Sequence, residues 1–362
     1  MTTLTFVGDI FPGDEMFTRG FGIKSKTNEH IGLLWVRDIS ETIGKSDYVI
    51  GNLEGPLVND ENRQHDTFYG HPLFAEILYK SGINVLNIAN NHILEHGEQG
   101  FGSTIETLRN NGILTVGEVW KGEPAITTFQ HDDIRFAMAG FCDERVCSMP
   151  NPDCYASIDE QVVMKTMQRM KDNGADVTIF IFHWGNEYIK MPSKEQRRLA
   201  YKLIDGGATL IVGHHPHVIQ PYEEYNGGHI VYSLGNFCFD DVQSSQFGKG
   251  MVAHVTFKGS KVEKVAFQGV KVQDMAFTNH IVKPMPSKKF CSYFESINNT
   301  YAYASSLSDS DYHRLYTMRR RRDHARECLM MRLSIIKHLL HPCHQHRGEL
   351  LSNIIQFIRR KL

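Results

Sequence analysis

Short apolar runs alternate with amphipathic stretches of helical length along most of the chain. The apolar runs are rich in β-branched residues, and several end in Gly, Asn, Asp or His, which is typical of buried strands. They span residues 4–9, 48–54, 84–91, 134–141, 177–185, 209–215, 229–236 and 250–257. Between them the pattern predicts helices over residues 99–112, 160–174 and 193–207, and the last two close on glycine, as helix ends often do.

Such apolar strands imply sheets that are covered on both faces, and therefore a layered α/β architecture. From about residue 285, after "VKPMPSKK", the strand pattern stops and a helical, basic region begins. We therefore expect a body over residues 1–284 and a helical basic extension over residues 285–362.

Charge separates these two regions as well. The net charge is −2 over 362 residues, but residues 314–362 hold twelve Lys or Arg against three Asp or Glu. This excess of nine positive charges leaves the remaining residues with a net charge of −11. A basic tail on an acidic body indicates two units with different partners. Nucleic acid is a weak candidate, because no aromatic residues interleave with the basic run at 319–322.

The segment "ELLSNIIQFIRRKL" at the end of the chain predicts an amphipathic helix. Leu351, Ile354, Ile355, Ile358 and Leu362 recur three or four residues apart and form one apolar stripe beside a cluster of cations. Two interpretations stay open for this helix. It docks on the body or on a second subunit, or it attaches the protein to an anionic membrane surface or a polymer synthesis complex.

Composition indicates a globular protein, since 41% hydrophobic residues in a chain of this length bury at least one large core. The first residues, "MTTLTFVGD", lack the pattern of a secretory signal, and no run of 18 uncharged apolar residues occurs. Seven cysteines at irregular spacing, without a CxxC pair, favour reduced thiols. We expect a cytoplasmic location, with peripheral attachment at the inner face of the membrane as an option.

Side chains with metal-ligand chemistry follow the predicted strands. They are Asp9, Asn52, Glu54, Asn91, His92, His183, His214, His215, His217 and Asn236. Because open α/β sheets place their sites at the carboxyl ends of strands, we expect these groups to gather around a divalent metal. Each has a plainer explanation when taken alone, as an N-cap, a turn residue or a buried histidine. Their recurrence after five strands favours the site.

The histidine run in "VGHHPHVIQP" is the most specific of these signals. Alternate residues of an extended segment point to one side, so His215 and His217 are predicted to face the site together, across Pro216. The alternative register, with His214 as the ligand, stays open.

Six motifs occur in a fixed order: "FVGDI", "GNLEGPL", "NIANNHILEHGEQGF", "FHWGNEYI", "GATLIVGHHPHVIQPYE" and "IVYSLGNFCFD". They closely resemble the CapA family of poly-γ-glutamate capsule biosynthesis proteins, whose fold is similar to calcineurin-like metallophosphoesterases. The resemblance covers roughly residues 3–270 and leaves the tail uncovered. It implies a four-layer α/β/β/α sandwich with two divalent metal ions, Mn, Fe or Zn, at the strand ends.

Carried over motif by motif, the resemblance also implies roles for single residues. The implied metal ligands are Asp9, Glu54, Asn91, His183, His215 and His217, with His92 as the catalytic histidine. Asn52 and Asn236 would orient the substrate or the ligands, and Glu54 stands where an aspartate usually bridges the metals.

Two departures from the family pattern affect these roles. Phe11 occupies the position of a metal-binding histidine, so Asp14, or a fuller use of Glu54, would have to compensate. The asparagine–histidine pair is followed by "LEHG", which offers Glu95 and His96 near the site.

The implied function is metal-dependent hydrolysis of a phosphoester or polymer-linked substrate in capsule, polyglutamate or cell-surface polymer biosynthesis. The alternative is a non-catalytic component of a polymer assembly complex that keeps the fold and a metal, which the missing histidine at Phe11 leaves open. The chain has no GxxxxGK[ST] loop, which argues against a P-loop ligase.

Overall fold

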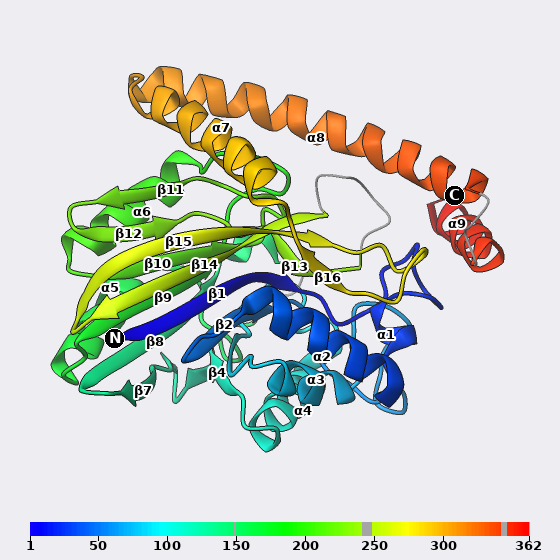
Figure 1. Ribbon diagram of the computed structural model, residues 1–362, viewed down its shortest axis with the longest axis horizontal. Coiled ribbons are helices and arrows are strands. Elements are labelled where there is room, and N and C mark those ends of the chain that lie inside the picture. The colour runs from blue at the N-terminus through cyan, green and yellow to red at the C-terminus, as the bar shows by residue number, and fades with distance from the viewer. Residues whose placement is uncertain (148–149, 241–247, 342–345, 362) are drawn as a thin grey trace.

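Two β-sheets packed face to face form the centre of the molecule, and helices cover their outer faces (Figure 1). The computed structural model describes residues 1–147, 150–240, 248–341 and 346–361. The larger sheet contains, in spatial order, β16 (Val282–Pro284), β15 (Lys261–Val272), β14 (Lys249–Lys258), β1 (Thr2–Ile10), β2 (Tyr48–Leu53), β3 (Val85–Asn87) and β4 (Leu114–Val116), with β13 (Asn236–Cys238) also paired to β1. The smaller sheet contains β11 (Tyr222–Tyr225), β12 (Gly228–Val231), β10 (Leu210–His214), β9 (Val177–His183), β8 (Ile134–Cys142) and β7 (Thr127–His131). A separate two-stranded sheet pairs β5 (Val119–Trp120) with β6 (Glu123–Pro124).

The strands near the middle of each sheet are parallel. β1, β2, β3 and β4 run parallel in the larger sheet, and β8, β9, β10 and β12 run parallel in the smaller one. Antiparallel strands lie toward the edges, with β14, β15 and β16 on one side of the larger sheet and β7 and β11 at the two edges of the smaller. Parallel strands present their carboxyl ends together, which is where binding sites form in such sheets.

Side chains alternate along the strands between separate cores. In β1, Leu4 and Phe6 face the space between the sheets, whereas Val7 faces the helices outside the larger sheet. In β9, Ile179 faces between the sheets and Phe180 faces the outer layer of the smaller sheet. Both faces of both sheets are therefore buried, and this explains why the strands read as nearly continuous apolar runs. The predicted four-layer α/β/β/α sandwich is confirmed.

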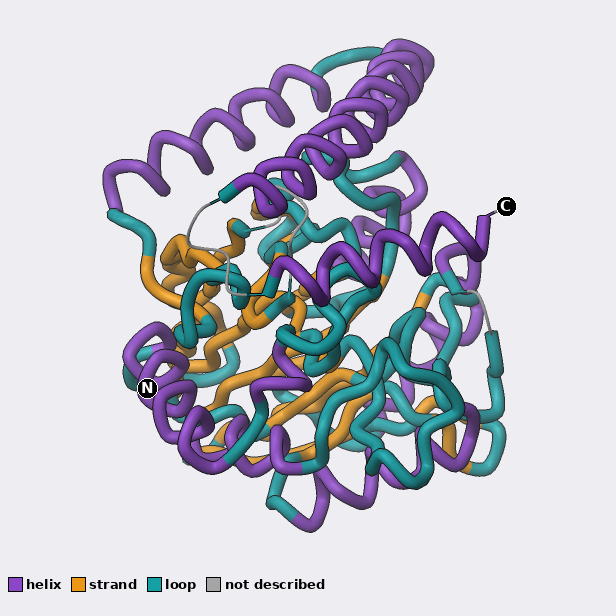
Figure 2. Tube along the Cα trace, turned by 90° about the vertical axis from the view of Figure 1, so that its right-hand side faces the viewer, coloured by secondary structure: helices purple, strands orange, loops and turns teal. Residues whose placement is uncertain are grey.

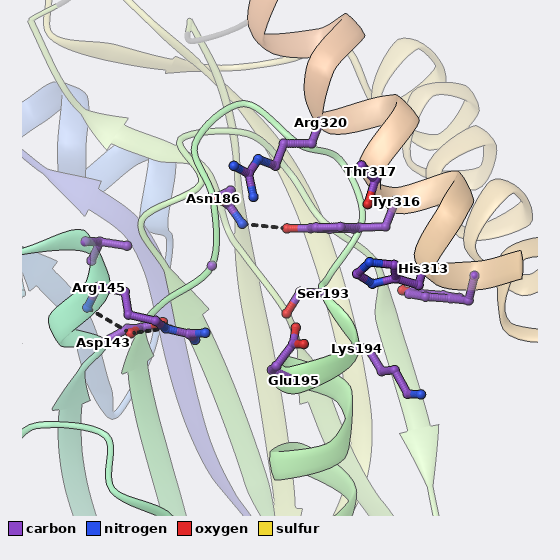
Figure 3. A pocket seen from close by; sticks show the side chains of 13 residues that line it. Asp143, Arg145, Asn186, Ser193, Lys194, Glu195, His313, Tyr316, Thr317 and Arg320 are labelled. Atoms are coloured by element: carbon purple, nitrogen blue, oxygen red, sulfur yellow. Dashed lines mark hydrogen bonds and ion pairs between the residues drawn. The ribbon is translucent and has the colours of Figure 1, made fainter. Parts of the chain in front are cut away.

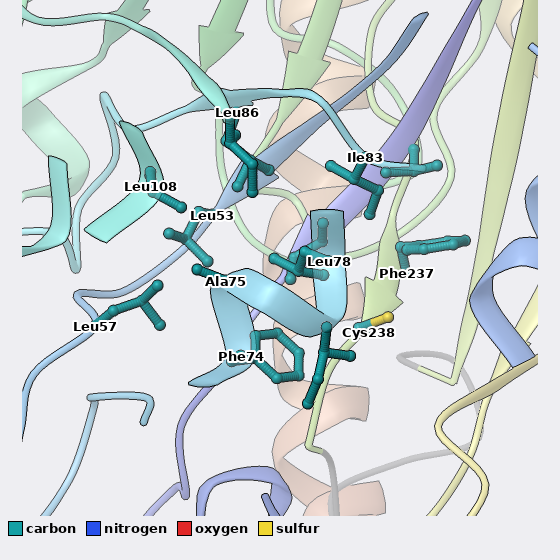
Figure 4. Close-up of a cluster of buried hydrophobic side chains, with 14 of the residues drawn as sticks. Leu53, Leu57, Phe74, Ala75, Leu78, Ile83, Leu86, Leu108, Phe237 and Cys238 are labelled. Atoms are coloured by element: carbon teal, nitrogen blue, oxygen red, sulfur yellow. The ribbon is translucent and has the colours of Figure 1, made fainter. Parts of the chain in front are cut away.

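The helices of the outer layers come from the connections between strands. They are α1 (Ile23–Lys26), α2 (Glu29–Ile43), α3 (Leu73–Lys80), α4 (Gly97–Asn110), α5 (Glu160–Asp172) and α6 (Lys194–Asp205). The core outside the larger sheet packs Phe74, Ala75 and Leu78 of α3 near Leu53 and Leu86 of the strands (Figure 4). The helices predicted from the apolar pattern are present as α4, α5 and α6.

A close approach of two backbones interrupts one predicted strand. The run over residues 229–236 divides into β12 and β13, and between them Gly235 has a φ of 67°. A Cβ atom at Gly8 would lie only 1.9 Å from the carbonyl oxygen of Gly235. The two glycines thus allow Asp9 to donate its backbone N–H to that oxygen at 2.9 Å. This contact places Asn236 of β13 beside Asp9 at the end of β1.

The extension consists of α7 (Ser287–Ser305), α8 (Asp309–Leu340) and α9 (Arg347–Lys361). In Figure 1, α7 and α8 pass over the top of the sheets and α9 lies below the end of α8. Figure 2 shows the two long helices α7 and α8 above the strands and α9 leading to the C-terminus lower in the view. Phe290 and Phe294 of α7 enter the core between the sheets, and Tyr312 and Tyr316 of α8 enter the core of the smaller sheet. The extension therefore shares the cores of the body. Within the described ranges, each helix is too short or too polar to cross a membrane.

Candidate metal centre

The ends of the parallel strands bring the predicted polar residues together. Asp9 lies near the end of β1 and pairs in register with Asn52 of β2 and with Asn236 of β13. In the smaller sheet, His183 at the end of β9 pairs in register with His214 at the end of β10. These buried residues lie at the carboxyl ends of the parallel strands in both sheets. Carboxylates and amides from the larger sheet therefore meet imidazoles from the smaller sheet.

Two groups of potential metal ligands form at this edge, and both include Glu54. Ligand atoms of Glu54, His215 and His217 lie within 4.8 Å of one another, and so do those of Asp9, Glu54 and His183. Each group could hold a divalent ion, and Glu54 is common to both. The assignment of these residues as ligands stays a prediction.

Glu54 lacks any hydrogen-bond partner for its two carboxylate oxygens among the described residues, although it is completely buried. Burial raises the pKa of this carboxyl well above its usual value, and the negative charge of Asp9 raises it further. His215 Nδ1 is also buried without a partner within the same described ranges. Unpaired buried polar atoms are costly, and a divalent cation would satisfy all three. The residues present therefore fit a metal.

Asp9 is held as an anion by its neighbours. Its Oδ1 atom accepts a hydrogen bond from Asn52 Nδ2 at 2.9 Å and lies 3.0 Å from His214 Nδ1, and its Oδ2 accepts the backbone N–H of His215 at 3.3 Å. Burial alone would raise the pKa of Asp9, but the contacts with His214 and His217 outweigh it and lower the pKa. His214 thus contacts Asp9 and lies outside both ligand groups, while His215 belongs to one of them.

His183 sits between the amides of the larger sheet and Glu54. Its Nε2 atom lies 2.7 Å from Asn91 Oδ1 and 3.7 Å from Glu54 Oε1, while Nδ1 lies 3.3 Å from Asn52 Nδ2. Asn52 is in turn fixed by Asn87, whose Nδ2 donates to Asn52 Oδ1 at 2.8 Å. Burial lowers the pKa of His183 well below its usual value, and the nearby histidines add to this effect. A neutral imidazole with a lone pair is the form that binds metals.

His215 and His217 do face the site, but not for the reason that the sequence suggested. The prediction of an extended segment is wrong, because His215 has a φ of 92° and His217 a φ of 55°, values in the left-handed region. Their ring centroids are 5.8 Å apart, and His217 Nε2 lies 3.5 Å from Glu54 Oε1. His217 Nδ1 also lies 2.9 Å from Asn236 Oδ1, which orients the ring. Such backbone strain concentrates at functional sites.

His92, the predicted catalytic histidine, occupies a more open position. Its side chain is 23% exposed, and its Nδ1 lies 2.9 Å from Glu95 Oε1. The ring stacks on Phe68 with centroids 4.7 Å apart. Burial would raise the pKa of Glu95, but the hydrogen bond with His92 outweighs it and lowers the pKa, so that Glu95 is a carboxylate. A histidine oriented by a carboxylate and reached by solvent is suited to proton transfer.

Phe11 and Asp14 show how the chain departs from the family pattern. Phe11 is buried against Phe68 and Phe239, with ring centroids 5.7 and 5.2 Å away. The carboxylate of Asp14 instead accepts hydrogen bonds from the backbone N–H groups of Gly20 and Ser25 at 3.1 and 3.0 Å, and from the hydroxyl of Ser25. Asp14 therefore holds the loop before α1, and the expectation that it replaces the missing ligand has no support in these contacts.

Two residues of the site were not selected from the sequence. Asn87 connects Asn52 to the backbone carbonyl of Ala89 through its side-chain amide. For Glu187, burial would raise the pKa, but His215 and His217 outweigh it and lower the pKa, so a third carboxylate faces these rings. Both residues lie in the quoted motifs, at or just after a strand end, and that position was the available signal.

A pocket of about 330 Å³ lies beside the centre, between α8 and the loops that follow β8 and β9 (Figure 3). Asn186 Nδ2 donates a hydrogen bond to Tyr316 Oη of α8 at 2.8 Å, and Arg320 of α8 also lines the pocket. On the opposite side, Asp143 accepts from Arg145 at 2.6 Å and donates its backbone N–H to the carbonyl of His183. The extension thus forms one wall of the space next to the strand ends.

Two lysines lie close to Tyr293 of α7, and one of them, Lys190, comes three residues after Glu187. Lys190 Nζ and Lys249 Nζ lie 5.2 and 5.1 Å from the ring centroid of Tyr293 in α7. Burial lowers the pKa of Lys190, and the nearby charges of Lys249 and Arg326 lower it further. Crowded cations of this kind attract anionic ligands.

The fold and this site together define a two-sheet α/β protein with a buried carboxylate–imidazole centre suited to divalent cations. The chain belongs to the family of bacterial capsule synthesis proteins PGA_cap, which matches residues 3–241. It is 32% identical to the capsule biosynthesis protein CapA of Bacillus anthracis, over 66% of this chain and 60% of that protein. It is 33% identical to the PGA biosynthesis protein CapA of Bacillus subtilis, over 65% of this chain and 63% of that protein. The chain thus spans about three fifths of the length of these relatives.

Among solved structures, the chain is similar to the calcineurin-like phosphoesterase YfkN from Bacillus subtilis. The identity is 14%, the match covers 74% of this chain and 90% of that chain, and the TM-score is 0.45. A likeness of this size leaves the activity of the chain open.

Proposed function

We propose that the protein is a metal-dependent phosphoester hydrolase that acts in capsule, polyglutamate or cell-surface polymer biosynthesis. The observation that carries this proposal is Glu54, a buried carboxylate without a hydrogen-bond partner among the described residues and common to both ligand groups. The cofactor proposed is a pair of divalent ions, with Mn, Fe and Zn suited to mixed imidazole and oxygen ligands. The proposed location is the cytoplasm, at the inner face of the membrane.

In this proposal each group at the strand ends has a distinct task. Asp9, Glu54, Asn91, His183, His215 and His217 would hold the ions. When bound, the ions would supply Lewis acidity and a hydroxide near neutral pH. Asn52 keeps Asp9 and His183 in place through its amide, and Asn236 does the same for His217.

His92 would move the proton in this reaction. Because Glu95 lies against Nδ1, it orients the ring, which leaves Nε2 to pass a proton to the departing oxygen of the substrate. The cations Lys190 and Lys249, which also lie near the carboxylate of Glu327, support an anionic substrate, such as a phosphoester joined to a polymer.

A second function is supported by Phe11. Where a metallophosphoesterase would offer a further histidine, this chain packs an aromatic ring into a small cluster with Phe68 and Phe239. The alternative proposal is therefore a non-catalytic component of a polymer synthesis complex that keeps the fold and a single metal.

Metal analysis combined with an activity assay separates the two proposals. The purified full chain is measured for Mn, Fe, Zn and Mg content, and hydrolysis of a chromogenic phosphomonoester and a phosphodiester is followed with each metal. Metal-dependent turnover that Glu54→Gln abolishes supports the hydrolase, and Glu263→Gln, at an exposed carboxylate of β15, is the matched control. Bound metal without turnover on either substrate would favour the assembly component.

A further inference from the structure

The long helix α8 exposes a stripe of large apolar side chains to solvent. Met318, Leu329, Leu333, Ile336 and Leu340 are 56%, 56%, 49%, 51% and 75% exposed. Their spacing of eleven, four, three and four residues places all five within a sector of roughly 60° at 3.6 residues per turn. Arg322 lies in the same sector between Met318 and Leu329, so the contiguous apolar stripe runs from Leu329 to Leu340. An exposed apolar stripe of this kind is a mark of an interaction surface.

The opposite face of α8 is already occupied by the body. Tyr312, Tyr316, Glu327 and His338 are its buried residues. His338 Nε2 lies 2.7 Å from Asp274 Oδ2, and Tyr312 Oη donates to the carbonyl of Pro192 at 2.7 Å. The orientation of α8 is therefore fixed by contacts with the body, and the apolar stripe is held outward by them.

The helix α9 also exposes apolar side chains. Of the stripe predicted for its sequence, Leu351, Ile355 and Ile358 share one exposed face, whereas Ile354 packs toward the body. Leu350 is completely buried near Phe21, and Ile354 packs against the same cluster, whereas Leu351, Ile355 and Ile358 are 50%, 42% and 50% exposed. The first interpretation, docking on the body, thus describes one face of α9, and Leu362 lies outside the described residues.

Cations lie on both sides of the stripe on α8. Helical geometry places Arg326 and Lys337 along one shoulder and Arg321 and Arg332 along the other. All four are exposed, and in the described part of the chain none of them forms an ion pair. Their charges are thus available to a partner.

We propose that the exposed faces of α8 and α9 bind the surface of an anionic lipid bilayer. An apolar stripe with cations on both shoulders fits such a surface, because the side chains of Leu and Ile enter the boundary of the acyl chains while Arg and Lys reach the phosphates. A second copy of the chain fits less well. In a two-fold pair of antiparallel α8 helices, each basic shoulder would face its own copy, and like charges would be opposed.

Docking in this way would bring the strand ends near the membrane. The buried face of α8 lines the pocket at Asn186 and Tyr316, next to the loop that follows His183. The surface itself does not depend on the chemistry of the metal centre. It holds equally for a hydrolase and for an assembly component.

Co-sedimentation of the full chain with vesicles tests this surface. We expect binding to vesicles of phosphatidylglycerol and phosphatidylcholine in equal parts at low salt, weaker binding at high salt, and little binding to phosphatidylcholine alone. Leu329→Gln with Leu333→Gln should weaken binding by about tenfold or more, since two apolar side chains would no longer enter the lipid. Arg326→Glu with Lys337→Glu should reduce binding to anionic vesicles most strongly at low salt.

The matched control is Leu33→Gln with Leu114→Gln, at exposed leucines 70% and 39% accessible on the body. Thermal unfolding of every variant should match the parent, because all changed side chains are exposed. Equal sedimentation of parent and the α8 leucine variant, or equal binding to neutral vesicles, would overturn the proposal. Absence of lipid binding together with a dimer in solution that the α8 leucine variant dissociates would instead assign the stripe to self-association.

Discussion

The metal centre and the extension depart in opposite ways from the usual distribution of side chains. In most proteins apolar side chains are buried and polar side chains are exposed or hydrogen-bonded. At the centre, Glu54 and His183 are polar and completely buried, and the oxygens of Glu54 have no hydrogen-bond partner among the described residues. On α8, Leu329 and Leu340 are apolar and largely exposed. Buried polar groups without partners and exposed apolar stripes are both unfavourable in an isolated chain. Each region therefore suits a partner from outside the chain: a cation at the centre and an apolar surface on α8.

The two regions differ in how they are held. The centre is built on strand ends in the middle of two sheets, where register and amide networks determine the position of each side chain. The extension is joined to the body by aromatic side chains, by hydrogen bonds such as that of Asn186 with Tyr316, and by ion pairs such as that of His338 with Asp274. A metal site needs ligand atoms placed to within fractions of an ångström. Binding to a bilayer surface needs only an apolar stripe with cations beside it.

The largest effect expected at the centre separates metal binding from proton transfer. His92→Ala should reduce turnover by about 10²–10⁴, the usual scale for a positioned acid or base, while the metal content stays unchanged. Asn91→Ala should lower metal affinity, because Asn91 Oδ1 lies 2.7 Å from His183 Nε2 at the position of a shared ligand. Metal content from mass spectrometry and turnover are measured for both variants. If His92→Ala and Asn91→Ala lost metal equally, the separate roles of His92 in proton transfer and Asn91 in metal binding would be contradicted.

A second effect tests whether Glu54 is unpaired because a cation belongs there. Glu54→Gln should weaken metal binding by more than about 100-fold, since residues that merely orient ligands already cost 10–100-fold when changed. In the metal-free protein the same change should stabilise the fold by about 1–3 kcal/mol at pH 8, because a buried unpaired charge is removed. Metal titration measures the affinity for the metal, and chemical denaturation of the metal-free protein measures the free energy of unfolding. A metal-free variant that is less stable than the parent would show that Glu54 has a partner of its own.

The pH dependence of the metal-free protein follows from the same residue. The pKa of Glu54 is raised in the folded state above its ordinary value of about 4.5, so the unfolded chain loses this proton first as the pH increases. The unfolded state then binds fewer protons, and the free energy of unfolding falls as the pH rises from about 4.5 through the folded pKa. In Glu54→Gln the free energy of unfolding should not show this part of the decrease with pH, because the titrating carboxyl is absent. Metal should restore stability at high pH in the parent alone.

Much of the fold was predictable because apolar periodicity reports burial directly. The runs in β1, β2, β9 and β10 are buried on both faces, and the helices α4, α5 and α6 each present one apolar face. The helices α2 and α3 and the strand β15 were not predicted. In β15 most side chains are exposed or half-buried, so the alternation that identifies a strand is weak.

The site was predictable as a set of residues but not as a geometry. Strand-end positions identified Asp9, Glu54 and His183, because parallel strands bring their ends together. The left-handed backbone at His215 and His217 could not be inferred, since these conformations depend on the tertiary contacts that compensate their strain. For the same reason, the division of the apolar residues in α9 required knowledge of what Leu350 packs against.

The smallest expected effect concerns the attachment of the extension. His338 Nδ1 lies 2.7 Å from the carbonyl of Ser334 and Nε2 lies 2.7 Å from Asp274 Oδ2, so both ring nitrogens face acceptors. Burial would lower the pKa of His338, but the ion pair with Asp274 outweighs it and raises the pKa. The contact therefore contributes fully below the unfolded pKa of about 6.5 and is lost as the pH rises through the folded pKa.

Hydrogen exchange resolves this local effect. Protection of the amides at the end of α8, corrected for intrinsic rates, should be high at pH 6 and fall at higher pH, while global stability changes by less than about 1 kcal/mol. His338→Gln should show low protection at both values, and His313→Gln, at an exposed position of the same helix, should behave like the parent. Protection in the parent that is independent of pH would mean that the aromatic contact between Phe277 and His338, with ring centroids 5.0 Å apart, holds the end of α8 without the ion pair.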